Sequence, residues 1–250
     1  MDPVIARLAA FALVLTRISA CFMVMPIFGS RSIPARVKVA AVVLLSMFFA
    51  MLNRPAVNLE ALGALQVGLL LFNEALYGLA IGQIASLVFS AVKLGGRIAE
   101  RQMGMAMAAV LDPFTGERTQ PLGSLLEMIF VILFLSANGH HVLLAAIGRS
   151  YQAFPVGAVP SVGRLTAGVI QAGSVMMIAG LQLAAPMLAA FLLLMVVLAV
   201  LARVVPEMNI FFISLPMRAG MGLLMAVIFL PLTARFVAEF ARWMGKLLPL

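Results

Sequence analysis

The chain has 250 residues, of which 64% are hydrophobic and 10% are charged, and its mean hydropathy is +1.15. A water-soluble domain carries charge on about a quarter of its residues, so these values exclude a soluble protein and predict an integral membrane protein. The net charge of +8 does not indicate nucleic-acid binding, because the basic residues are scattered between apolar segments, as in membrane proteins.

Six long apolar segments follow one another, at residues 4–28, 35–52, 61–92, 122–147, 166–202 and 219–248. The third and fifth would reach roughly 50 Å as straight helices, against a hydrocarbon core of ~30 Å. We therefore expect them to tilt, break or extend beyond the bilayer within a larger assembly. Pro186 and Pro231, which lack a backbone donor, are the expected break points. The predicted fold class is an all-α integral membrane protein of about six long, kinked helices.

The first segment contains Arg17 and the single cysteine, Cys21. Arg17 either contacts a buried acid such as Glu74 or lies near a helix end with its charge at the interface. One cysteine excludes an internal disulfide framework. The start Met1-Asp2-Pro3 has no positively charged leader, so we expect no cleaved signal peptide.

Glu74 lies in the middle of the third apolar segment. A carboxylate there costs about 2.5–3.5 kcal/mol on insertion scales, so it should face protein or water. It could relay protons or ions, but a structural pairing with a buried base, or with an amide such as Gln83, is favoured because no second mid-membrane carboxylate accompanies it. Gly78 and Gly82 follow with GxxxG spacing, which predicts close helix packing around Glu74.

A methionine-rich run follows the third segment and leads into a stretch with Pro and Gly that is too interrupted for a helix. Methionine side chains repack around irregular partners at little strain, so this run is either a deformable gasket or ordinary core packing. The gasket interpretation is favoured by the adjoining loop. Its candidate residues are Met103, Gly104, Met105, Met107, Asp112, Pro113 and Pro121.

His140 and His141 are adjacent and have no further ligand at metal-binding spacing. We expect an interfacial turn or helix start, with hydrogen-bonded imidazoles and no metal site. The chain shows no nucleophile–base–acid constellation and no phosphate-binding loop, so we expect no enzyme activity and no cofactor. The Pro- and Gly-rich connector 148–165 predicts a boundary between a four-span part and a two-span hairpin.

Together these motifs resemble the FliR family of flagellar export-gate proteins over essentially the whole chain, and less closely its counterpart in virulence type III secretion. The matching motifs, in order, are Arg17, Pro26–Gly29, Ile33–Lys38, Glu74 with Gly78 and Gly82, Gln102–Gly104, Asp112-Pro113, Pro121, Asn138–His140, Pro155–Gly157, Pro186 and Arg203–Phe211.

The resemblance implies one strand of a helical, funnel-shaped export gate, built with two smaller membrane proteins called the P and Q components. Residues 1–165 would be a P-like part with a plug loop at about 103–121, and residues 166–250 a Q-like helical hairpin. The implied location is the bacterial inner membrane, in the flagellar basal body. The hairpin loop would face an FlhB-like export component, through Arg203, Pro206, Asn209 and Phe211.

The implied function is a passive, gated conduit for unfolded flagellar subunits, in contact with membrane lipid and not with nucleic acid. The alternatives are a small-solute secondary transporter or channel subunit, which is the runner-up, and the homologous gate subunit of a virulence system. A secondary transporter or channel for small solutes would instead predict paired in-membrane charges and repeated halves. An intramembrane enzyme would need a polar constellation that is missing, and a pure scaffold would differ only in whether the loop lines the path.

Overall fold

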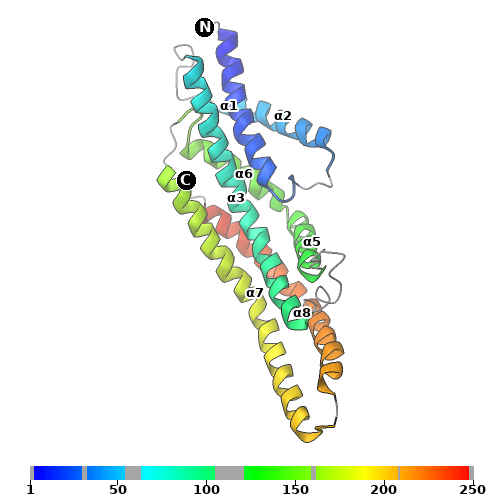
Figure 1. Cartoon of the computed structure of the whole chain (residues 1–250). Helices are drawn as coiled ribbons and strands as arrows, with labels where there is room; N and C mark the ends of the chain where they lie inside the picture. The colour runs from blue at the N-terminus through cyan, green and yellow to red at the C-terminus, as the bar shows by residue number, and fades with distance from the viewer. Residues whose placement is uncertain are drawn as a thin grey trace, which may run out of the picture. The chain divides into compact units, whose positions relative to one another are not determined.

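The computed structural model describes residues 3–29, 33–53, 63–104, 121–158, 162–207 and 209–247. Every regular element in these residues is an α-helix, which confirms the predicted fold class. The helices are α1 (Pro3–Val24), α2 (Ala35–Leu52), α3 (Ala64–Met103), α5 (Pro121–Ser136), α6 (Gly139–Ala153), α7 (Val162–Val204) and α8 (Ile210–Leu247) (Figure 1). Among them, α1, α2, α3, α7 and α8 are long and apolar enough to cross a membrane, and the α5–α6 pair makes a sixth if counted as one bent span.

Several helices are longer than their apolar segments. α3 continues past residue 92 to Met103, and α8 begins at Ile210 instead of residue 219. The additional turns of α3 contain Lys93, Arg97 and Arg101, and Lys and Arg are good helix formers. The end of an apolar run therefore does not mark the end of a helix. The predicted boundaries of the third and sixth segments were therefore too narrow.

The fourth apolar segment is divided between α5 and α6. The division falls at Asn138, whose φ of 57° lies in the left-handed region that asparagine tolerates better than most residues. α6 then starts at Gly139, so His140 and His141 lie in its first turn, as expected for a helix start. Their rings are 4.2 Å apart, and His140 Nδ1 has no hydrogen-bond partner among the described residues, contrary to the expected hydrogen bonding. Since α6 reaches Ala153, the connector before α7 is also shorter than the predicted 148–165.

The prolines do not end their helices. α7 runs through Pro186, and α8 runs through Pro216 and Pro231. The predicted breaks at Pro186 and Pro231 were wrong, because a proline removes one hydrogen bond while the neighbouring turns keep theirs. The 40 residues of α3 and 43 of α7 correspond to lengths of about 60 and 65 Å. Both exceed the ~30 Å hydrocarbon core, so tilting or extension beyond the bilayer accommodates them.

The chain forms two compact units. Unit 1 consists of Met1–Val88, Asn138–Ser174 and Phe240–Leu250, and unit 2 of Phe89–Ala137 and Val175–Glu239. The boundary between them falls inside α3, α7 and α8. These units combine segments from both predicted parts, 1–165 and 166–250, so the P-like and Q-like division remains a proposal.

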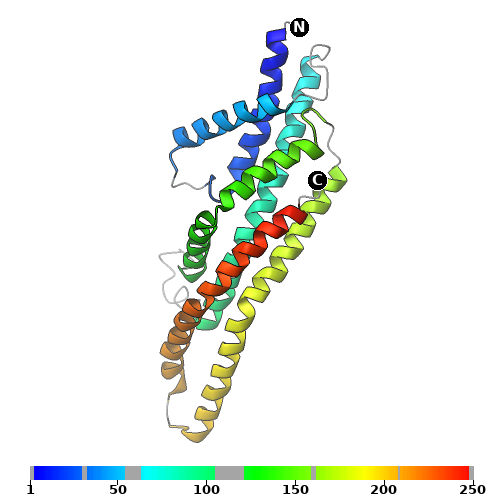
Figure 2. The same cartoon turned by 180° about the vertical axis from the view of Figure 1, so that it is seen from behind.

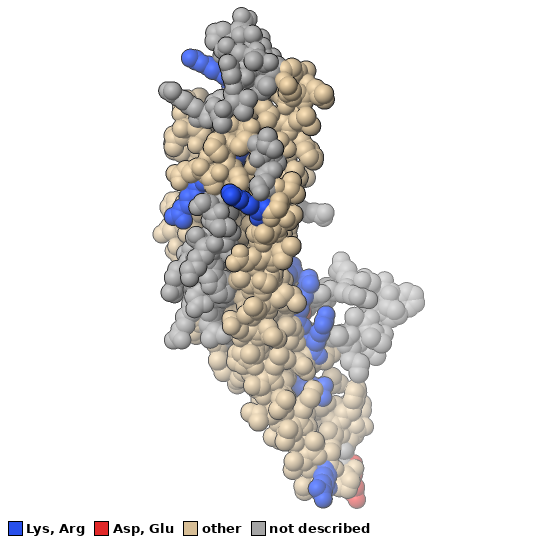
Figure 3. Space-filling model, turned by 90° about the vertical axis from the view of Figure 1, so that its left-hand side faces the viewer, with Lys and Arg blue, Asp and Glu red and all other residues tan. Residues whose placement is uncertain are grey.

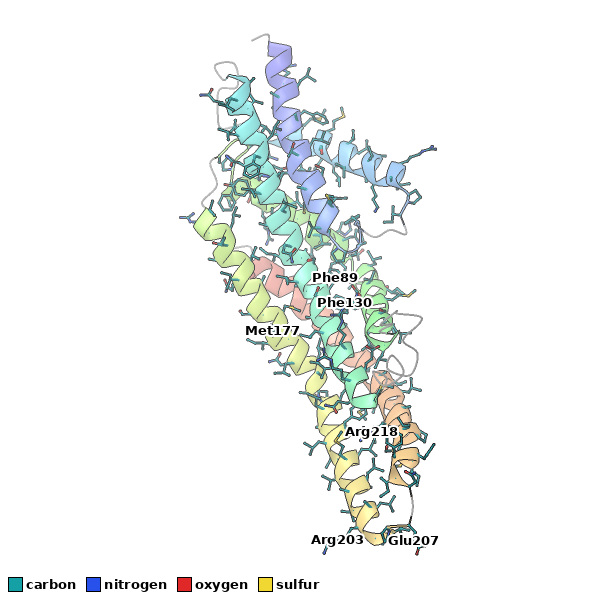
Figure 4. All side chains as sticks on the ribbon, viewed as in Figure 1. Phe89, Phe130, Met177, Arg203, Glu207 and Arg218 are labelled. Carbon is teal, nitrogen blue, oxygen red and sulfur yellow. The ribbon has the colours of Figure 1, made fainter. Side chains whose placement is uncertain are left out.

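In unit 1, α2 packs against α1, and α6 contacts both of these helices (Figures 1 and 2). Phe154, directly after α6, packs on Tyr77 in the first half of α3. In unit 2, the C-terminal part of α3 packs on α5 through Phe89, Phe130 and Phe134, with ring centroids 5.2–6.3 Å apart (Figure 4). The parts of α7 and α8 in this unit form an antiparallel hairpin, in which α7 ends at Val204 and α8 begins at Ile210.

Large apolar side chains cover much of the surface of both units. Met23 is 81% exposed, Leu65 80% and Met177 62%. Figure 4 shows Met177 pointing away from α7. In Figure 3, separate groups of Lys and Arg lie between wide areas of other residues. A surface of this kind is stable against lipid or against other membrane proteins.

Candidate functional site

A buried ion pair joins α1 to α3 in unit 1. Arg17 Nε donates a 2.5 Å hydrogen bond to Glu74 Oε2, and both residues are fully buried. The second carboxylate oxygen, Oε1, accepts a 2.8 Å hydrogen bond from the backbone N–H of Gly157. Gly157 has a φ of 82°, which favours glycine, so this residue fits the turn that aims its N–H at Glu74. The sequence left two environments open for Arg17, and the structure shows the contact with Glu74.

The rest of the Arg17 guanidinium is held by α6 and by two tyrosine rings. Nη1 donates to the carbonyl of Phe154 at 3.0 Å and, at 3.4–3.5 Å, to the carbonyl and hydroxyl of Ser150. Arg17 Cζ lies 4.8 Å from the ring centroid of Tyr77 and 4.3 Å from that of Tyr151. Nη2 has no hydrogen-bond partner among the described residues, and the electron-rich ring faces contribute to stabilising the cation as a whole. The centre therefore ties together α1, α3, α6 and the turn after α6.

Glycines bring the two helices close enough for this pair. A Cβ at Gly78 would collide with the backbone carbonyl of Arg17 and would lie 2.9 Å from Cβ of Ala20. A Cβ at Gly82 would lie 2.7 Å from the carbonyl oxygen of Cys21. Both glycines therefore form the α1–α3 contact, as GxxxG spacing permits. The charges of this centre are paired with each other, and its hydrogen bonds are made to other groups of the protein. It therefore has the geometry of a structural contact that holds α1, α3 and α6 together.

Unit 2 contains a second polar connection, between α3 and the start of α5. Glu100, which is 6% exposed, accepts hydrogen bonds from the backbone N–H groups of Leu122 and Gly123. These N–H groups belong to the first turn of α5 and have no acceptor within the helix. Lys93 Nζ lies 2.7 Å from Glu127 Oε2, with both side chains partly exposed. Together these contacts fix where α5 begins.

The end of α3 is anchored on α8. Met103 is 5% exposed, and its side chain fills the space that a Cβ on Gly222 would need. Gly104 follows with a φ of 77°, close to Leu215. Met103 and Gly104 therefore form the anchored root of the predicted plug loop. Pro121 is the first residue of α5, at the other end of that loop. The predicted plug residues Met105, Met107, Asp112 and Pro113 lie outside the described residues.

The turn between α7 and α8 carries the predicted partner-facing residues. Arg203, Pro206, Asn209 and Phe211 are all exposed, Phe211 by 56%. Figure 4 shows Arg203 and Glu207 at this turn with their side chains directed away from the helices. An exposed aromatic beside charged groups is suited to a protein contact.

Sequence reasoning identified Arg17, Glu74 and the two glycines but missed their other partners. Tyr77 lies three residues after Glu74 on α3, so a helical-spacing argument could have found it. Ser150, Tyr151 and Gly157 come from residues far along the chain, and no local pattern connects them to Arg17.

Comparison with known proteins assigns the chain to one family. The family model of bacterial export proteins, family 1, matches residues 8–243. The chain belongs to the FliR family of these export proteins. It is 33% identical to the flagellar biosynthetic protein FliR of Bacillus subtilis, over 91% of this chain and 88% of the relative. Identity to FliR of Escherichia coli is 29%, over 89% and 84% of the two chains.

The chain is also similar to a translocation protein. It is 30% identical to the Yop proteins translocation protein T of Yersinia pestis, over 89% of this chain and 86% of the relative. The matched region contains the Arg17–Glu74 centre, the anchored root at Met103 and the α7–α8 turn. All three features therefore lie within the FliR-type part of the chain.

Proposed function

We propose that this chain is the FliR-type component of the flagellar protein export gate, in the bacterial inner membrane. With P and Q components it would form part of the conduit through which unfolded flagellar subunits leave the cell. The family match over residues 8–243, with nearly full coverage of flagellar relatives, is the observation that carries this proposal. The proposed role is non-enzymatic, and the energy for export would come from other components.

The helices support a role inside an assembly. α3 and α7 are longer than a bilayer requires, and their exposed residues include Leu69, Phe72, Leu192 and Val196. Apolar surface on parts of a helix beyond the hydrocarbon core is stable only when other proteins cover it. In this proposal the P and Q components provide that cover, with residues 1–165 as the P-like part and 166–250 as the Q-like hairpin.

The plug is the second element of the proposal. The loop between Met103 and Pro121 would limit leakage of water and ions when no substrate occupies the conduit, with Met105 and Met107 as its deformable contacts. The burial of Met103 against Gly222 supports a fixed root for such a loop.

Deleting residues 105–116 tests the plug. We expect the ion leak across the membrane to rise while the complex still assembles, measured as membrane conductance in cells that express the complete gate. Replacement of Gly222 by Ala displaces Met103 and should also raise the leak, whereas Gly220→Ala, whose Cβ meets no atom within 4 Å, is its matched control. An unchanged conductance in the deletion would exclude the plug role.

The exposed turn at Arg203–Phe211 is the proposed contact with an FlhB-like component. Site-specific photo-crosslinking from residue 206 should give an adduct with that component, and crosslinking from exposed Arg7 in unit 1 should not. Absence of the adduct in an assembled gate would exclude this contact.

Native mass spectrometry of the tagged protein, extracted gently from its own membranes, tests the gate itself. Recovery with several copies of two smaller hydrophobic proteins supports the proposal, and recovery as a monomer or homo-oligomer opposes it. The Yersinia relative favours a virulence-system gate as the second candidate. Restoration of swimming in a strain lacking FliR, but not of secretion in a strain lacking the virulence counterpart, would assign the chain to the flagellum.

A further inference from the structure

The buried centre around Arg17 contains three polar atoms that still need a hydrogen-bond partner. Arg17 Nη2 and the hydroxyls of Tyr77 and Tyr151 are buried, and none of them has a partner among the described residues. Arg17 is 0% exposed, Tyr77 1% and Tyr151 3%. A buried polar group without a partner is costly, and native proteins rarely leave several of them together. These atoms therefore indicate a further hydrogen-bonding molecule inside unit 1.

The three atoms belong to one place in unit 1. Arg17 Cζ lies 4.8 Å from the ring centroid of Tyr77 and 4.3 Å from that of Tyr151, so both rings lie against the same guanidinium. Each ring also has a second aromatic contact. Tyr77 packs on Phe154 with the ring centroids 4.7 Å apart, and Tyr151 packs on Phe49 with the centroids 5.6 Å apart. The packed rings hold both hydroxyls in the protein interior, away from bulk water.

The protein acceptors around the guanidinium already bind other donors. Its Nε donates to Glu74 Oε2, and its Nη1 donates to the carbonyl of Phe154. Glu74 Oε1 accepts from the N–H of Gly157. The hydroxyl of Ser150 donates to the carbonyl of Ile147 at 2.7 Å, so its proton is not directed at either tyrosine. The centre thus has donors and hydroxyls to spare, but no spare carboxylate.

We propose that this centre binds ordered water, which accepts a hydrogen bond from Arg17 Nη2 and hydrogen-bonds to the hydroxyls of Tyr77 and Tyr151. The Arg17–Glu74 pair has no net charge, so the site has no excess charge to attract a cation or an anion. The near-complete burial of its residues excludes a large molecule. A buried water typically makes two to four hydrogen bonds to protein groups, and one N–H donor with two hydroxyls supplies that number.

Bound water changes the energetics of the ion pair. It gives Nη2 an acceptor, so the guanidinium is buried with less loss of hydrogen bonding. It also gives each tyrosine a role beyond its ring, because the hydroxyl helps to hold the water beside the cation. Tyr77 and Tyr151 are therefore positioning residues for the contact between α1, α3 and α6.

Replacing each tyrosine by phenylalanine tests the site through the sign of the effect. The full-length protein is purified with any membrane proteins that co-purify, and its unfolding is followed by circular dichroism. If water is bound, Tyr77→Phe and Tyr151→Phe each break a hydrogen bond and should lower the midpoint temperature by about 2–4 °C. A hydroxyl without a partner has the opposite effect, because its removal relieves the cost of a buried polar group. A raised or unchanged midpoint in either variant would overturn the proposal.

Radiolytic footprinting detects the water in the wild-type protein and does not depend on a variant. The protein is equilibrated in oxygen-18-labelled water and exposed briefly to X-rays, which convert bound water into hydroxyl radicals that oxidise the nearest aromatic rings. Peptide mass spectrometry should find the label on Tyr77 and Tyr151 despite their burial. Phe191, which is 2% exposed and lies outside the centre, is the matched control and should be labelled much less. Labelling of the two tyrosines no stronger than that of Phe191 would overturn the proposal.

Discussion

The two units use charge in opposite ways. In unit 1, Arg17 and Glu74 are fully buried, and backbone groups and two tyrosine rings surround the pair. In unit 2, the side chains of Lys93 and Glu127 are 33% and 26% exposed. Water screens the second pair, whereas the first depends entirely on its partners. The comparison predicts that removing one partner of the ion pair lowers the stability of the protein much more in unit 1 than in unit 2.

Removing one partner of the buried pair should have the largest effect. Glu74→Ala leaves the Arg17 guanidinium buried without a counter-charge, which costs about 3–5 kcal/mol. Unfolding of the detergent-solubilised protein, followed by circular dichroism, measures this loss. The double variant Arg17→Met with Glu74→Leu should recover most of the stability, because two apolar groups need no counter-charge. A double variant as unstable as the single one would show that side-chain packing, and not charge, determines how much the centre contributes to stability.

The glycine contact should come next. Gly78→Ala drives a Cβ into the carbonyl of Arg17, and overpacking of this kind costs about 1–3 kcal/mol. Gly68→Ala is the control on the same helix, because a Cβ there meets no atom within 4 Å. We expect the control to be at least as stable as the wild type in the same unfolding assay, because alanine is a better helix former than glycine. Equal losses in both variants would show that the α1–α3 contact is not responsible.

Loss of the α5 cap should have a moderate effect. Glu100→Ala leaves the N–H groups of Leu122 and Gly123 without their acceptor, at a cost of about 0.5–2 kcal/mol. Amide hydrogen exchange should speed up in the first turn of α5. Glu207→Ala, at the exposed α7–α8 turn, removes the same side chain without a cap and should leave exchange in α5 unchanged.

Breaking the exposed pair should have the smallest effect. Lys93→Gln should cost about 1 kcal/mol or less, and the difference from wild type should shrink as salt is added. Unfolding in low and high salt measures it. A loss comparable to that of Glu74→Ala would show that unit 2 shields its charges as completely as unit 1.

The sequence predicted the all-α membrane fold because apolar runs are long and local. It did not predict where the helices end or break, because single residues determine those positions. The apolar run is divided between α5 and α6 just before Asn138-Gly139, although this pair is a recognisable turn signal. Pro186 left α7 continuous, because the cost of one lost hydrogen bond depends on the turns around it.

At the candidate site, the sequence predicted single residues better than their partners. Glu74 was recognisable because a mid-membrane acid is rare. Its contact with Arg17 was one of two environments that the sequence left open, and the folded arrangement decides between them. Its other partner, Gly157, lies far from it along the chain, so only the fold reveals that contact. Glu100 and Gly222 were missed for the same reason, since the α5 cap and the Met103 contact each join separate segments.

The buried pair also has a consequence for biosynthesis. Arg17 and Ser150 are 133 residues apart, which corresponds to about 7–27 s of synthesis at ~5–20 residues per second. Glu74, 57 residues after Arg17, is made early in this interval, but the acceptors on Ser150 and Phe154 are made only at its end. The cation on α1 is therefore fully satisfied only after most of the chain has been synthesised.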